Sequence, residues 1–454
     1  MNYTFREILP YYRRNLRVAF PVMLTQLGAA LVGLFDSIMV GHYATTDLAA
    51  VSFSNAIFFT VMVFSMGTTM GITPLVGHAY GAKRWDKIAP YLANGLVYTL
   101  IICLLSILLL APCIGLLDKF GQEPVVVACA RPYYILIVLS ILPHLFFCFF
   151  KQFLEGLGNT FVAMVITILC NLLNIFLNWV LIFGHMGFAP MGAEGAGWGT
   201  LISRTLMPLC FLAVILCRKD WRQYWQAMRR HMIRWSDIRR LLGIGTPIGM
   251  QSFSEAFLFT ASFIIIGWIN KETLAAHHIA NQMADLTFML ALGIGSATTI
   301  RVSHQLGKGD LHAVRMASRA SVHLCLMMNT IGACIMIFGR NYIPYIFTDD
   351  PEVIPIASSL LVIAGTLQYA DGLQCIGAAM LRGIQDVRVP MRIAIAAYIV
   401  IALPLGLLLT FPVGWGAQGM WIAFVIALAI PAVLFHLRFH KQLKRIEHGT
   451  KSSF

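Results

Sequence analysis

The chain has 454 residues, of which 58% are hydrophobic and 12% are charged, and its mean hydropathy is +0.76. This composition is that of a chain whose main solvent is lipid, so it excludes an ordinary soluble domain. The formal net charge of +13 would also suit a nucleic-acid-binding protein. The positions of the basic residues decide between these two explanations.

Twelve apolar stretches follow one another along the chain, each with the roughly 20 residues that a helix needs to cross a bilayer. The first follows several arginines, as a signal peptide would. It is too long, however, and ends without a small-residue cleavage site, so we expect a retained helix. The pattern predicts an all-α integral membrane protein. The predicted spans are residues 16–42, 48–78, 90–117, 130–150, 160–184, 193–217, 241–269, 274–304, 313–340, 353–378, 388–411 and 416–437.

Basic residues gather in every second loop, most densely in residues 218–240 and 438–454. With an even number of spans, the positive-inside rule places both termini and all of these loops in the cytoplasm. The basic excess therefore indicates orientation in a membrane, and we expect no nucleic-acid partner. The ten cysteines lie mostly within spans and form no CxxC, so they are interpreted as packing residues and not as disulfides or metal ligands.

The two halves of the chain repeat one another with a shift of 226 residues (267 − 41). Gly41 aligns with Gly267 and Pro21 with Pro247, and the series continues without a gap. Six spans per half give both halves one orientation, so we predict two six-helix lobes related by a pseudo-two-fold axis along the membrane normal. Two such lobes are typical of transporters that rock about a central solute. The predicted parts are an N-terminal lobe at 1–217, a basic cytoplasmic linker at 218–240, a C-terminal lobe at 241–437 and a basic cytoplasmic tail at 438–454.

Three acids within the predicted spans stand out, Asp36, Glu255 and Asp371, because a charged residue at the bilayer centre costs about 2.5–3.5 kcal/mol on insertion scales. From the helical rise, Glu255 lies about 22 Å and Asp371 about 17 Å above the cytoplasmic edge. We expect these two acids to converge in the C-terminal lobe and to hold H⁺ or Na⁺. The alternative is that a neighbouring hydroxyl satisfies each acid, which then only locks helices together.

Asp36 is alone in its predicted span. Asn174 and Asn178 lie on one face of the fifth span at a similar depth, so the three residues are predicted to form a polar site in the first lobe. The repeat places Ser262 at the position equivalent to Asp36 (36 + 226). Arg204 is interpreted as a structural partner of a carboxylate or of backbone carbonyls, and His277 as an interfacial residue.

The sequence has no P-loop, HExxH or GxSxG motif and no loop long enough for a nucleotide domain, so we expect neither ATP hydrolysis nor another enzymatic activity. Aromatic and Met side chains are common near the polar positions, and a few could line a soft pocket for flat, cationic molecules. The candidates for this substrate cavity are Gln282, Phe259, Phe288, Tyr369 and Met283.

Several ordered motifs resemble the multidrug and toxic compound extrusion (MATE) transporters over essentially the whole chain, and within them the NorM-type branch. They include "FDSIMVGHYATTDLAAVS" around Asp36, "FLEGLGNT" after the fourth span, "SFSEAF" around Glu255 and "YADGLQCIGAAMLRGIQD" around Asp371. The resemblance implies cation-coupled export of cationic, often aromatic drugs by alternating access. It also implies that Glu255 and Asp371 bind Na⁺ or H⁺. Asp36, Asn174 and Asn178 are implied to form the cation-coupling site of the first lobe. Leu367 replaces a tyrosine that some NorM-type proteins carry, which puts an aromatic contribution to the ion site in doubt.

Two other functions are compatible with twelve spans. A lipid-linked sugar flippase of the same superfamily would favour an Arg- and Lys-rich cavity, whereas this chain has acids in its spans. An intramembrane enzyme acting on lipids would need paired catalytic groups, which the sequence does not offer. We expect a monomer in contact with membrane lipids, small cationic or aromatic substrates, and no cofactor apart from Na⁺ or H⁺ as the coupling ion.

Overall fold

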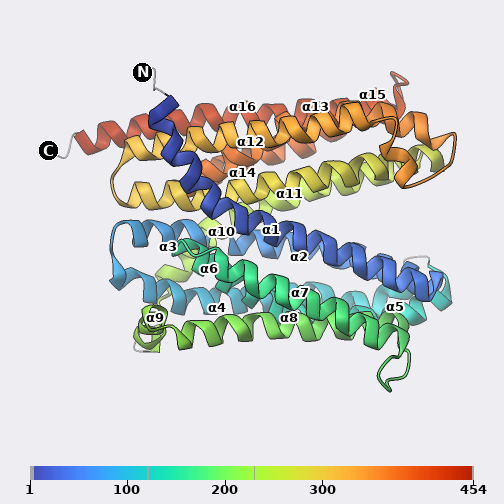
Figure 1. Cartoon of the computed structure of the whole chain (residues 1–454), viewed down its shortest axis with the longest axis horizontal. Coiled ribbons are helices and arrows are strands. Elements are labelled where there is room, and N and C mark those ends of the chain that lie inside the picture. The colour runs from blue at the N-terminus through green and yellow to red at the C-terminus, as the bar shows by residue number, and fades with distance from the viewer. Residues whose placement is uncertain (1–4, 120–121, 230, 452–454) are drawn as a thin grey trace. The chain divides into compact units, whose positions relative to one another are not determined.

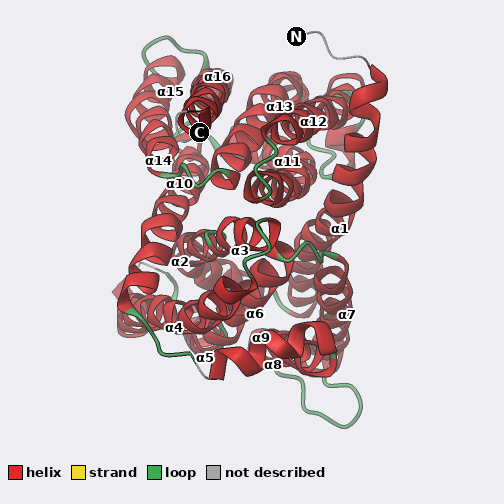
Figure 2. Ribbon diagram, turned by 90° about the vertical axis from the view of Figure 1, so that its left-hand side faces the viewer, coloured by secondary structure: helices red, strands yellow, loops and turns green. Residues whose placement is uncertain are grey.

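The computed structural model describes residues 5–119, 122–229 and 231–451. These ranges contain helices and connecting loops and no strand (Figures 1 and 2). Twelve segments are long and apolar enough to cross a membrane, and each coincides with one predicted span. The predicted fold class is therefore confirmed.

The described chain forms two compact units, which we call the N-terminal unit (Leu24–Gly249) and the C-terminal unit (Met1–Met23 with Met250–Phe454). Helices α1 (Phe5–Tyr43) and α10 (Trp235–Gly267) belong partly to each unit. In the N-terminal unit follow α2 (Thr45–Thr69), α3 (Ile72–Gly81), α4 (Trp85–Leu110), the 3₁₀ segment η1 (Ala111–Lys119), α5 (Pro124–Leu139), α6 (Ile141–Gly156), α7 (Phe161–Phe183), α8 (Gly192–Cys217) and α9 (Lys219–Arg229).

The C-terminal unit continues with eight further helical segments. They are α11 (Lys271–Gly307), α12 (Leu311–Gly339), the 3₁₀ turn η2 (Ile343–Ile346), α13 (Val353–Gly383), α14 (Arg388–Ile395) with the π-helical segment η3 (Ala396–Ala402) and α15 (Leu403–Thr410), and α16 (Gly416–Lys451). Local signals fix the starts of two of these helices. Asn270 accepts a hydrogen bond from the Thr273 amide at 2.7 Å and Asp310 one from the Ala313 amide at 2.8 Å, so each caps the helix that follows.

The first part of α1 belongs to the C-terminal unit, and the first part of α10 belongs to the N-terminal unit. Asn15 on α1 donates to the Ala317 carbonyl at 2.9 Å within the C-terminal unit. On α10, Gly245 lies so close to Tyr98 of α4 that a side chain there would collide with it. The boundaries between the compact units thus lie within helices α1 and α10. The lobes at 1–217 and 241–437 were predicted from the sequence repeat, and their boundaries stay a prediction. The segment at 218–240 contains α9, and α16 extends through most of 438–454.

In each unit one helix packs against several others. In the N-terminal unit α8 packs against α5, α6 and α7, and in the C-terminal unit α13 packs against α11, α12 and α16. The core of the C-terminal unit includes the fully buried rings of Trp421, Phe424 and Phe435 from α16. Helices that are apolar on most faces are expected where lipid and protein together form the surroundings.

Candidate functional site

Glu255 on α10 and Asp371 on α13 lie in the C-terminal unit and act on one another electrostatically. Asp371 is 6% exposed. One oxygen of each carboxylate, Oε1 of Glu255 and Oδ1 of Asp371, is buried with no hydrogen-bond partner among the described residues. Buried polar atoms are nearly always satisfied in folded proteins, so two orphaned acidic oxygens in one unit require an explanation.

Residues that the sequence did not single out complete the surroundings of these acids. Gln374, nearly one turn after Asp371, hydrogen-bonds the Glu255 side chain and also donates to the hydroxyl of Tyr398. Arg382, further along α13, acts electrostatically on Glu255. The i, i+3 spacing of Gln374 from Asp371 was a usable signal. Tyr398 lies on η3, and no pattern in the sequence indicated that it belongs to this site.

Asp285 on α11 is a third acid of this unit that the sequence reasoning missed, although a charge within the predicted span 274–304 was visible. It is exposed and accepts a hydrogen bond from Asn281 at 2.9 Å, one turn earlier. It also acts electrostatically on Asp371. Asp371 is therefore influenced by two other carboxylates of its unit, Glu255 and Asp285.

The predicted cavity residues do not share one environment. Phe259 and Met283 pack against the hydrophobic core, and the Phe259 ring lies 5.2 Å from that of Phe424. Tyr369 is 36% exposed and donates to Thr330 at 3.1 Å. Gln282 and Phe288 are half-buried on α11.

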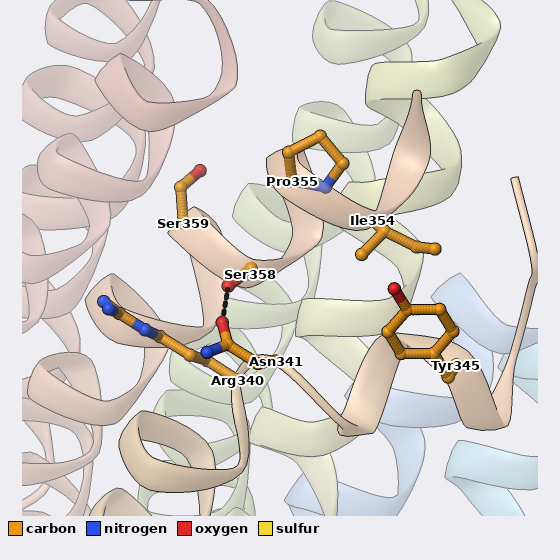
Figure 3. A pocket seen from close by; sticks show the side chains of 7 residues that line it. All are labelled: Arg340, Asn341, Tyr345, Ile354, Pro355, Ser358 and Ser359. Atoms are coloured by element: carbon orange, nitrogen blue, oxygen red, sulfur yellow. Dashed lines mark hydrogen bonds between the residues drawn. The ribbon is translucent and has the colours of Figure 1, made fainter. Parts of the chain in front are cut away.

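A hollow of about 430 Å³ lies elsewhere, at the end of α12 and the start of α13. Figure 3 shows Ser358 hydrogen-bonded to Asn341 on one side of it and Tyr345 on the other, and the two side-chain oxygens of that bond are 3.2 Å apart. None of the predicted cavity residues lines this hollow.

The described residues contain no group of three His, Cys, Asp or Glu side chains that could hold a metal ion. If Na⁺ is the transported ion and binds at Glu255 and Asp371, amides, hydroxyls or backbone carbonyls would therefore have to supply its remaining oxygen ligands. Hard cations accept such ligands, and the two orphaned carboxylate oxygens are suitable first ligands.

In the N-terminal unit the structure brings Asp36 together with both predicted asparagines. Asn178 donates to Asp36 Oδ1 at 2.6 Å and to Asn174 Oδ1 at 3.4 Å. Asn174 in turn donates to the Ser203 hydroxyl at 3.1 Å. A Cβ atom at Gly199 would collide with the side-chain oxygen of Asn178, so the glycine on α8 leaves the space that this amide needs.

Arg204 on α8 supplies the positive charge of the Asp36 site. It acts electrostatically on Asp36 and on Tyr133, and it donates to the Ser140 hydroxyl at 2.8 Å. Its guanidinium carbon also lies 5.6 Å from the centre of the Phe58 ring. Arg204 therefore has the role of a partner to a carboxylate, one of the two that its position suggested.

His277 is fully buried, so its interpretation as an interfacial residue was wrong. Trp421 Nε1 donates to His277 Nδ1 at 3.0 Å, and His277 Nε2 lies 3.1 Å from the hydroxyl of Ser262. Because Nδ1 accepts, the ring proton of a neutral imidazole is assigned to Nε2. A buried histidine with a partner on each nitrogen links α10, α11 and α16.

A family model for MatE matches residues 21–180 and 247–408, more than half of the chain. The chain belongs to the MATE family. The probable multidrug resistance protein NorM of Xylella fastidiosa (strain 9a5c) is 32% identical over 438 residues, covering 96% of this chain and 93% of its own length. The protein of the same name from Rhizobium meliloti (strain 1021) is 31% identical over 452 residues, covering 98% and 96%.

Solved structures of MATE transporters share the fold of this transporter. The eukaryotic transporter AtDTX14 gives a TM-score of 0.85 at 19% identity, with coverage of 97% of this chain and 99% of that chain. A MATE structure in the bent conformation gives 0.87 at 18% identity, covering 99% and 100%. The resemblance to the NorM branch is confirmed, and multidrug efflux across a bacterial inner membrane through a multi-pass protein is supported.

Proposed function

We propose that this transporter is an antiporter that exports cationic, amphipathic molecules in exchange for Na⁺ or H⁺ by alternating access. One observation carries the proposal: Glu255 and Asp371 interact within one unit, and each presents a buried oxygen without a hydrogen-bond partner among the described residues. Two like charges in such surroundings repel one another, so each gains when a proton or a metal cation neutralises the pair.

The substrate is proposed to contact α11 near Asp285. This exposed acid, its partner Asn281 and the half-buried Phe288 recur at i, i+4 and i+7 and therefore lie on one face of the helix. A carboxylate beside an aromatic ring attracts a cation that also has an apolar surface. Gln282, Phe259, Tyr369 and Met283 remain proposed cavity residues.

Antiport follows from the interaction of Asp285 with Asp371. A coupling ion at Asp371 removes negative charge from the surroundings of Asp285, so it weakens the attraction for a cationic substrate, and the converse holds by reciprocity. One ion moving down a potential of about 100 mV supplies about 2.3 kcal/mol. That electrical contribution cancels if a monocationic substrate is exchanged one for one.

The remaining features of the proposal come from the sequence. From the basic loops, both termini are proposed to lie in the cytoplasm. The transporter is proposed to act as a monomer, with the coupling ion as its energy source and without ATP, a cofactor or a catalysed reaction.

The test uses purified protein in liposomes and measures ethidium transport driven by a Na⁺ or a proton gradient. Glu255→Gln and Asp371→Asn keep the shape of each side chain and remove its charge, so each should abolish ion-driven transport. Glu272→Gln is the matched control, because it removes an acid of α11 whose contact is a 3.6 Å ion pair with exposed Lys271. Wild-type transport rates in both site variants would contradict the proposal.

A further inference from the structure

Helix α6 carries a line of polar side chains that the proposed site does not use. We call Ser140, His144, Cys148, Lys151 and Glu155 the α6 stripe. Their spacing of i, i+4, i+8, i+11 and i+15 places them on one face of a helix whose other positions are largely apolar. Glu155 follows Ser140 by 15 residues, so the stripe extends over about 22 Å of helix.

The middle and the far end of the stripe contain buried polar atoms without hydrogen-bond partners among the described residues. They are both ring nitrogens of His144 and Oε1 of Glu155. Side chains at i and i+4 are about 5–6 Å apart on a helix, too far for a direct hydrogen bond and suitable for one bridging water. A chain of waters along the stripe would satisfy all three atoms.

The upper end of the stripe meets the Asp36 site. Arg204 donates to the Ser140 hydroxyl at 2.8 Å and acts electrostatically on both Asp36 and His144. The stripe therefore starts where the carboxylate of α1 is held.

The lower end of the stripe approaches the end of α6 that is predicted to face the cytoplasm. Lys151 donates to Gln26 of α1 at 3.3 Å, and it also acts electrostatically on Glu155, which is 1% exposed. Gln26 precedes Asp36 by ten residues, about 15 Å of helix, and Ser140 precedes Lys151 by eleven, about 16 Å. Helix α1 thus contacts the lower end of the stripe through Gln26 and is linked to its upper end through Arg204, which acts electrostatically on Asp36.

The order of charges along the stripe suits conduction and not storage of protons. Arg204 and Lys151 lie on either side of His144 and both act on it electrostatically, so the imidazole lies between two cations. The acids Asp36 and Glu155 lie outside these two cations. An imidazole in this position can accept a proton at one nitrogen only as it releases one from the other.

We propose that the α6 stripe is a proton route that joins Asp36 to the cytoplasmic end of the N-terminal unit, with His144 as its carrier. A proton leaves the Asp36 carboxylic acid for a water molecule, the bare nitrogen of His144 accepts a proton while the other nitrogen releases one to the next water, and the Glu155 carboxylate takes it up. Only O–H and N–H bonds form and break. This route rests on the proposed ion-coupled export and adds a path for protons that leave Asp36, separate from the ion that Glu255 and Asp371 are proposed to bind.

The test compares proton movement with substrate binding in the same preparation. Liposomes that contain a trapped pH-sensitive dye report proton flux during ethidium exchange. His144→Gln and Glu155→Gln keep polar side chains of similar size but cannot pass a proton, so each should lower proton flux at least tenfold. Ethidium affinity in detergent should stay within twofold of wild type.

A matched control removes a buried polar group of the same unit that lies off the stripe. Thr167→Val on α7 fits, because its hydroxyl bonds only its own helix, at the Ala163 carbonyl. It should keep wild-type proton flux. The wild-type flux should also fall in D₂O, and this isotope effect should disappear in the two stripe variants.

The outcomes separate the route from the function on which it rests. Wild-type proton flux in both His144→Gln and Glu155→Gln would overturn the route. So would a loss of flux that is matched by an equal loss of ethidium affinity and of melting temperature, because the stripe would then only tie α1 to α6. Wild-type export driven by Na⁺ without proton movement overturns the route and leaves the proposed function standing. No ion-driven export by the wild type would overturn the proposed function itself.

Discussion

Asp36 in the N-terminal unit and the pair Glu255 and Asp371 in the C-terminal unit are all carboxylates within membrane spans, but their surroundings differ. Asp36 accepts a 2.6 Å hydrogen bond from Asn178 and interacts with the cation of Arg204. Glu255 and Asp371 interact with one another and each leaves a buried oxygen unsatisfied. A satisfied carboxylate is held in one geometry, whereas an unsatisfied one lowers its free energy by binding a cation.

The second half of the repeat has the same helix at the position equivalent to Asp36, but it carries no acid there. Ser262 lies there beside buried His277, which accepts a hydrogen bond from Trp421. This network is neutral and every member has a partner, so it links three helices without a buried charge. The duplicated frame thus supports an acid in one unit and a neutral link in the other.

The largest expected effect is the loss of coupling in Asp371→Asn. In the wild type the coupling ion should weaken ethidium binding by a coupling free energy of about 1–3 kcal/mol, or roughly 5- to 150-fold. Asp371→Asn should reduce this factor to one, because the charge that links ion and substrate is removed. Asp36→Asn should keep most of it. The measurement is the ethidium Kd with and without saturating Na⁺ and at two pH values.

An equal loss of coupling in Asp36→Asn would mean that the satisfied acid binds the same ion. The contrast between the two units would then fail. Glu272→Gln serves as the control here as well, since its acid lies at the start of α11 and takes part in an ion pair with Lys271.

Adding one methyl group tests the two units by the same physical change. Gly199→Ala would place a Cβ atom against Asn178, which donates to Asp36. Gly372 follows Asp371 in the sequence, and Gly372→Ala would place a Cβ atom against Asn329. Overpacking of this kind costs about 1–3 kcal/mol, and the displaced amides add to it, so both melting temperatures should fall. Gly33→Ala on α1 is the control, because nothing lies within 4 Å of its Cβ position. A Gly33→Ala variant as unstable as the other two would remove the steric explanation.

Hydropathy and the rarity of charge were enough to predict the twelve spans and to single out Asp36, Glu255 and Asp371. The period of an α-helix was enough to place Asn174 and Asn178 on one face, because that relation is local in sequence. Both kinds of inference use neighbouring residues only.

Contacts that join distant helices could not be predicted in the same way. The partner of His277 is Trp421 on α16, and the partner of Gln374 is Tyr398 on η3, so nothing near either residue in sequence indicates the pairing. His277 lies near a span end, where most histidines are interfacial, and packing against Phe263 on α10 and Trp421 on α16 buries it. Asp285 is different: its charge was readable in the sequence and was overlooked.

Trp421→Phe should have a smaller effect than the glycine variants. It removes the donor to His277 Nδ1 and leaves that buried acceptor without its partner, which costs about 1–3 kcal/mol, and the smaller ring adds a small cavity. Detergent melting curves should show the loss, while ethidium affinity and coupling remain at wild-type values, since the link is neutral. A change in coupling would show that this neutral network takes part in transport, contrary to the comparison between Ser262 and Asp36.

The smallest expected effect compares an exposed ion pair of the N-terminal unit with a partly buried one of the C-terminal unit. Arg131 and Asp118 are 2.7 Å apart, with 47% and 65% of their side chains exposed, whereas Arg438 and Asp386, also at 2.7 Å, are 26% and 16% exposed. Arg438 makes a second bond to Asp386 at 3.1 Å. An exposed pair contributes about 0–1 kcal/mol, so Arg131→Gln should leave the melting temperature unchanged. Asp386→Asn should lower the melting temperature measurably, because Arg438, which makes two hydrogen bonds to Asp386, loses its negatively charged partner. Equal shifts in the melting temperatures of the two variants would show that exposure does not set the strength of these ion pairs. The argument from burial could then not be applied to the acids inside the spans.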